Sequence, residues 1–91
     1  MGTVRYRVIY EGRVQGVGFR YTTASIARRH PVSGYVKNLA DGTVEVQVEG
    51  PRERVDAFLR DVAAVFGENI THSTVQEASP DVSQEGFHIR H

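Results

Sequence analysis

Hydrophobic residues recur along this chain with two different periods, and the period changes at glycine and proline. Near the N-terminus, Val4, Tyr6, Val8 and Tyr10 occupy every second position, which is the period of a strand with one buried face. In residues 43–50, valine alternates strictly with glutamate or glutamine. This second segment predicts a strand with one apolar and one polar face.

Two other segments show the helical period. From residue 19 or 20 to about residue 30, apolar and small side chains fall on one helical face, and Pro31 predicts the end of this helix. The second helix is predicted to begin at Pro51, because proline is tolerated in a first turn. Its apolar positions continue to Phe66, and the following glycine is a plausible stop.

The full set of predicted elements alternates between strands and helices, and polar or glycine-containing loops join them. In chain order they are strand 4–12, helix 19–30, strand 33–40, strand 43–50, helix 51–66, a rather polar strand 70–77, a loop 79–84 and a short strand 86–90. The order β-α-β-β-α-β with an extra C-terminal strand is that of the ferredoxin-like α/β sandwich, in the α+β class. We therefore expect an antiparallel sheet covered on one face by two helices. Asp41-Gly42 predicts a two-residue hairpin in which both residues have positive φ.

Composition narrows the class of protein further. With 91 residues, the chain is expected to form one domain over 1–91. Eleven basic and eleven acidic residues give no net charge, which argues against a general nucleic-acid binder. Cysteine is absent, so thiolate chemistry is excluded. The N-terminal residues show no secretory signal and no apolar run could span a bilayer, so we expect a cytoplasmic protein without membrane partners. We also expect a monomer.

The segment from Gly12 to Arg20 carries the candidate chemistry. It has three glycines within residues 12–18 and joins a predicted strand to a helix N-terminus, where unpaired N–H groups favour anions. A cation such as Arg20 is unfavourable in a first helical turn unless an anion is shared with these N–H groups. Glycines at such junctions also serve as simple turn residues. Physical reasoning alone therefore leaves both an anion-binding site and a purely structural turn open. The known mononucleotide and dinucleotide loop motifs do not fit.

Three segments together resemble a known family. Residues 12–20, Gly-Arg-Val-Gln-Gly-Val-Gly-Phe-Arg, resemble the signature of the acylphosphatases. Residues 34–38, Gly-Tyr-Val-Lys-Asn, resemble that family's second motif, and residues 41–45 resemble the hairpin after it. The resemblance covers nearly the whole chain. It departs from the family at Tyr35, where many members carry tryptophan, and in the polar segment 70–77.

The resemblance implies an enzyme that hydrolyses the carboxyl-phosphate bond of acyl phosphates without a metal or other cofactor. It implies that Arg20 binds the phosphate and that Asn38 orients the attacking water. Inorganic phosphate or sulfate would bind as product or mimic. The backbone N–H groups implied in phosphate binding are those of Gln15, Gly16, Val17, Gly18, Phe19 and Arg20.

Other polar and aromatic residues are assigned structural roles. His30 is expected to lie at a helix end with its side chain bonded to a carbonyl, and Asp41 is expected to stabilise a turn rather than act as a base. Three arginines are expected to form a solvated edge: Arg5, Arg7 and Arg13. Four tyrosines are expected to lie in the core or on the sheet surface: Tyr6, Tyr10, Tyr21 and Tyr35. The four histidines show no metal-ligand spacing, so no metal site is expected.

Two competing functions stay open at this point. The ferredoxin-like fold also occurs in RNA-binding modules, although the aromatic pattern of those modules is absent here. The chain could alternatively resemble a domain that serves a larger enzyme, as in the carbamoyl-phosphate-processing maturation proteins of hydrogenases. Fold alone does not decide between these functions and hydrolysis.

Overall fold

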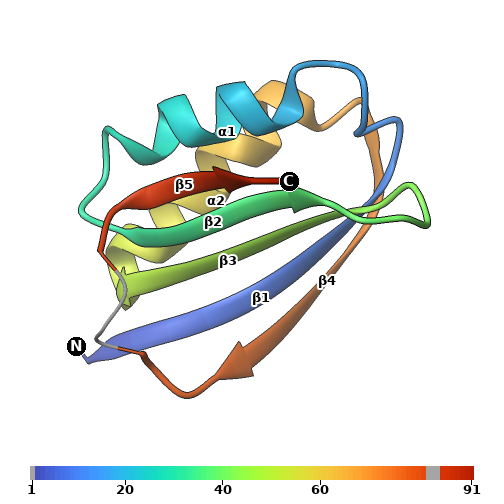
Figure 1. The fold of residues 1–91 in the computed structure, drawn as a ribbon. Helices are drawn as coiled ribbons and strands as arrows, with labels where there is room; N and C mark the ends of the chain where they lie inside the picture. The colour runs from blue at the N-terminus through green and yellow to red at the C-terminus, as the bar shows by residue number, and fades with distance from the viewer. Residues whose placement is uncertain (1, 82–84) are drawn as a thin grey trace.

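A computed structural model of the chain describes residues 2–81 and 85–91. The helices and strands within these residues are β1 Thr3–Gly12, α1 Phe19–Ala27, β2 Ser33–Asn38, β3 Val44–Pro51, α2 Arg52–Phe66, β4 Ile70–Ala78 and β5 Phe87–Arg90. The predicted α+β order of strands and helices is confirmed (Figure 1). Part of the predicted loop 79–84 lies outside the described residues, since these do not include residues 82–84.

The strands form one sheet in the order β4-β1-β3-β2-β5. The pairs β1–β3, β1–β4 and β2–β3 are antiparallel, as the ferredoxin-like pattern predicts. The short strand β5 instead joins β2 in parallel, so the five-stranded sheet is mixed. Both helices cover the same face of this sheet (Figure 1).

The core lies between that face and the two helices. Val44, Val46 and Val48 of β3 are fully buried, which confirms the apolar face predicted from strict alternation. Phe58 and Val62 of α2 are also fully buried and belong to the same cluster. Packing of this cluster fixes the positions of β2 and α1, which carry the candidate site.

The opposite face of the sheet is polar but well packed. The side chains of Glu45 and Glu49 are only 9% and 8% exposed, because Arg7 Nε donates to Glu45 Oε2 at 2.6 Å and Arg5 Nη1 donates to Glu49 Oε1 at 3.4 Å. Burial alone would raise the pKa of Glu45, but hydrogen bonds from Arg7 and Gln47 outweigh it and hold this pKa below its ordinary value. The expectation that Arg5 and Arg7 form a solvated edge is wrong, because β1 lies between β4 and β3.

Helix α1 ends at Ala27, about three residues before the predicted end. The N–H groups of residues 28–30 donate to carbonyls three positions earlier, so the chain leaves the helix through a tighter turn. The His30 side chain meets Asp61 of α2, with 2.8 Å between Nε2 and Oδ2. The predicted carbonyl partner of His30 is therefore replaced by a carboxylate that ties the two helices together.

The turn between β2 and β3 differs from the predicted two-residue hairpin. Leu39 N donates to Thr43 O at 2.9 Å and Gly42 N donates to Leu39 O at 3.2 Å, which leaves a three-residue loop at 40–42. Only Gly42 has positive φ (92°), whereas Asp41 does not. The sequence Asp-Gly also fits a three-residue loop, in which a type I turn is followed by a glycine with positive φ. The dipeptide alone therefore does not fix the length of the loop.

The Asp41 carboxylate is a turn acceptor, as predicted. Its Oδ1 accepts hydrogen bonds from Thr43 N at 3.0 Å and from Thr43 Oγ1 at 2.6 Å. These bonds, the side-chain bond first, hold the pKa of Asp41 below its ordinary value. A carboxylate stabilised in its charged form is a weak base, which agrees with a structural role.

Candidate active site

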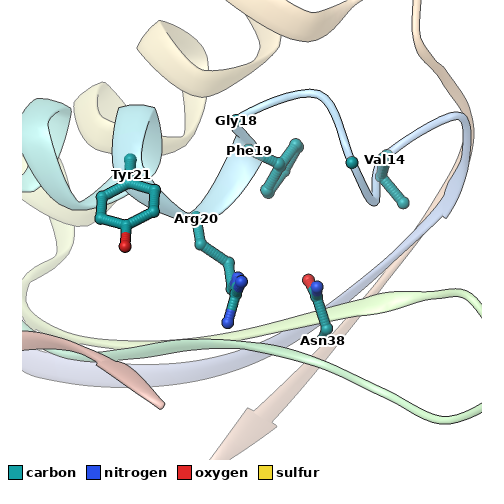
Figure 2. A pocket seen from close by; sticks show the side chains of 7 residues that line it. Val14, Gly18, Phe19, Arg20, Tyr21 and Asn38 are labelled. Atoms are coloured by element: carbon teal, nitrogen blue, oxygen red, sulfur yellow. The ribbon is translucent and has the colours of Figure 1, made fainter. Parts of the chain in front are cut away.

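A cavity lies where the loop after β1, the first turn of α1 and the end of β2 meet (Figure 2). Backbone and side-chain atoms of three separate segments form its walls. The residues that line it are Val14, Gly16, Gly18, Phe19, Arg20, Tyr21 and Asn38.

The loop of this cavity presents backbone N–H groups. Gly16 and Gly18 have φ of 78° and 77°, and Gly18 is the N-cap of α1. An added Cβ at either glycine would meet nothing within 4 Å, so glycine is needed there for backbone conformation rather than for space. Within the described ranges, the N–H groups of residues 15–20 donate to no backbone carbonyl. Such a row of N–H groups at a helix N-terminus can bind an anion.

Two apolar side chains hold the loop at its ends. Val14 is fully buried and Phe19 is only 2% exposed. The Phe19 ring packs between Tyr10 of β1, at 5.2 Å between ring centroids, and Phe66 of α2, at 4.5 Å. Because both anchors belong to the core, the N–H groups between them are held in a fixed arrangement before any ligand arrives.

The Gln15 side chain ties the same loop to the β2–β3 turn. Its Nε2 donates to Leu39 O at 2.8 Å and to Thr43 O at 2.9 Å. Leu39 directly follows Asn38, so this bridge fixes the loop relative to the end of β2 that carries Asn38. The sequence predicted a role for the Gln15 backbone only, and the bridge shows a second role for its side chain.

Arg20 extends from the first turn of α1 toward the end of β2 (Figure 2). Its Nη1 lies 3.0 Å from Nδ1 of His91. Because a guanidinium can only donate, His91 Nδ1 accepts this bond, and the other N–H groups of Arg20 can face the cavity. Sequence reasoning missed His91, since the two residues are 71 positions apart and meet only because α1 and β5 lie in contact.

Asn38 is the last residue of β2 and pairs with Val44 of β3. Its Oδ1 is buried and, among the described residues, has no hydrogen-bond partner. Leaving a buried acceptor unpaired costs roughly 1–3 kcal/mol. Figure 2 shows the Asn38 amide directed toward the loop and Arg20. An unpaired acceptor in this position indicates a site built for a ligand that donates a hydrogen bond.

The structure thus brings Arg20 and Asn38, predicted from two separate motifs, to one cavity. Gly16, Gly18 and Phe19 also line it. Gln15 and Val17 are not among the lining residues, and the predicted role of their backbone N–H groups stays a prediction.

Tyr21 also lines the cavity, although it was predicted to be a core or sheet-surface aromatic. It lies on α1 and is 69% exposed, so that prediction is wrong.

The described part of the chain contains neither a candidate metal site nor a candidate membrane span. Among residues 2–81 and 85–91, no three side chains of the metal-ligating types gather closely enough to hold a metal ion. In the same residues, neither helix combines the length and the apolar character needed to cross a bilayer.

Comparison with known proteins identifies the fold and the family. The crystal structure of acylphosphatase from Bacillus subtilis matches with a TM-score of 0.85 at 34% identity, over 97% of this chain and 99% of that one. The protein is therefore a ferredoxin-like α+β hydrolase. The family model for acylphosphatase matches residues 6–89, so the chain belongs to the acylphosphatase family. The acylphosphatase of Bacillus velezensis is 46% identical over 77 residues, which are 82% of this chain and 84% of that protein.

A second similar structure shows the same fold inside a longer protein. Full-length HypF in its phosphate- and nucleotide-bound form matches with a TM-score of 0.85 at 27% identity. The match covers 99% of this chain but only 12% of HypF.

Proposed function

We propose that this chain hydrolyses the carboxyl-phosphate bond of acyl phosphates to a carboxylate and inorganic phosphate. One observation carries the proposal: Asn38, whose Oδ1 is buried and has no hydrogen-bond partner among the described residues, lines the same cavity as Arg20 and the loop glycines Gly16 and Gly18. An acceptor for a water molecule and donors for a phosphate thus occur together. Membership of the acylphosphatase family supports the same reaction.

In this proposal, the loop and Arg20 bind the phosphoryl group. The N–H groups of residues 15–20 donate to its oxygens at the positive end of α1. The Arg20 guanidinium donates to two oxygens at once, which a planar fork does better than an ammonium group. Since the loop is anchored in the core, these donors need little reorganisation as charge shifts in the transition state.

Asn38 positions the attacking water. Its buried Oδ1 accepts a hydrogen bond from the water and directs an oxygen lone pair toward phosphorus. Positioning of this kind converts a random encounter into an aligned attack. The water oxygen bonds to phosphorus, the bond from phosphorus to the acyl oxygen breaks, and a water proton passes to a phosphate oxygen.

The leaving group explains why no acid is needed. A carboxylate leaves without a proton, because its conjugate acid has a pKa of about 4 to 5. In agreement, the seven residues found to line the cavity include no aspartate or glutamate. Asp41, three residues after Asn38 in the chain, is already engaged by Thr43 and is unsuited to act as a base.

A direct assay tests the proposal. In the presence of a metal chelator, the protein is expected to hydrolyse benzoyl phosphate, with inorganic phosphate as a competitive inhibitor. Phenyl phosphate is the matched control, since its phenolate leaving group has a pKa of about 10 and needs a proton that this site does not supply. Comparable hydrolysis of both compounds, or of neither, would contradict the proposal.

Three other predictions from the sequence stay predictions. They are the monomeric state, the cytoplasmic location, and the lack of nucleic-acid and membrane partners. If RNA caused a salt-sensitive shift and no acyl phosphate were hydrolysed, the binding-module alternative would be favoured instead.

A further inference from the structure

Tyr21 is the most exposed of the large hydrophobic residues in the described part of the chain. It is 69% exposed, compared with 55% for Val65 and 53% for Val75. Unlike those two valines, Tyr21 lines the cavity that contains Arg20 and Asn38. Its ring contributes little to the core, so its contact with the cavity is the feature that needs an explanation.

The positions of Tyr21, Arg20 and Asn38 indicate which part of the substrate Tyr21 would contact. Figure 2 shows Arg20 between Tyr21 and Asn38. In phosphoryl transfer, the attacking and leaving oxygens lie roughly in line on opposite sides of phosphorus. If Asn38 holds the water, the acyl group leaves in the direction away from Asn38. Tyr21 lines the same cavity and lies across Arg20 from Asn38 in Figure 2, so it is placed to contact that group.

We propose that Tyr21 forms the subsite for the acyl group and favours acyl phosphates with an aromatic or large apolar acyl group. This inference rests on the proposed function. A flat ring at the cavity mouth offers an apolar face to another ring, and such pairs prefer offset-stacked or edge-to-face contact. The small acetyl group has no ring and would cover little of this surface.

Two substrates and two variants test this subsite. The ratio of kcat/KM for benzoyl phosphate to that for acetyl phosphate is measured for wild type, Tyr21→Ala and Tyr21→Phe. In Tyr21→Ala the ratio is expected to fall by roughly three- to tenfold, the strength of one aromatic pair, through a higher KM for benzoyl phosphate. Tyr21→Phe keeps the ring and is expected to keep the ratio. Val65→Ala, which shortens an exposed apolar side chain on α2, is the control.

The possible outcomes separate this inference from the proposed function. An unchanged ratio in Tyr21→Ala, or an equal loss for both substrates, would overturn the acyl subsite while leaving hydrolysis intact. A loss in Tyr21→Phe as large as in Tyr21→Ala would assign the effect to the hydroxyl group and would also overturn it. If wild type hydrolysed neither substrate, the proposed function would fall, and this inference with it.

Discussion

Arg20→Ala is expected to lower kcat/KM for benzoyl phosphate by about 10³- to 10⁵-fold, the range found for arginines that stabilise phosphoryl transfer. The substitution removes the only charged side chain among the residues found to line the cavity. The loop N–H groups alone would then have to balance the phosphate charge. Inhibition by inorganic phosphate is expected to disappear in the same variant, and both quantities come from steady-state kinetics.

Two further variants sharpen this prediction. Arg20→Lys keeps the charge but loses the planar fork, so it is expected to restore only part of the activity. Arg13→Ala removes an exposed arginine of the same loop that does not line the cavity, so it is expected to behave like wild type. An equal loss in Arg13→Ala and Arg20→Ala would show that general loop charge, rather than the Arg20 contact, drives binding.

Asn38→Ala is expected to lower kcat by about 10²- to 10³-fold, the cost of losing one positioned polar group. Phosphate inhibition is expected to stay nearly unchanged, because Arg20 and the loop N–H groups are retained. The substitution also removes a buried oxygen that lacks a partner, so the free energy of unfolding is not expected to fall as it does for an ordinary buried residue.

Asn38→Asp is the informative companion variant. It keeps an oxygen of similar position but adds a negative charge beside the phosphate, so phosphate inhibition is expected to weaken. Chemical denaturation and inhibition assays on the two variants separate water positioning from phosphate binding. A large loss of phosphate affinity in Asn38→Ala would contradict the role assigned to this residue.

Much of the fold could be predicted from hydrophobic periodicity, because the period shows which face of each strand or helix is buried. The strict alternation in β3 gave its buried valines correctly. Element ends were less predictable, since they depend on partners that are distant in the chain. Helix α1 stops early where residues 28–30 tighten into a turn, and His30 then meets Asp61 on the other helix.

The site was predictable where its chemistry is local. The glycines and Arg20 lie in one short segment, and the second motif ends at Asn38. The contact of Arg20 with His91 was not predictable, since it needs β5 to pair with β2 beside α1. Tyr21 was misplaced for a related reason: helical periodicity shows which positions share a face, but not where a cavity opens beside them.

In the proposed mechanism, the N–H groups of residues 15–20 and the Arg20 side chain bind one phosphate together. The most direct measurement is a titration of the ¹⁵N-labelled protein with inorganic phosphate, followed by amide chemical shifts. The backbone amides of residues 15–20 are expected to shift together along one saturating curve. The amides of residues 75–77 in β4, which pair with residues 6–8 of β1 away from the loop, are expected to stay unchanged. If phosphate inhibited hydrolysis without moving the loop amides, the account would be contradicted.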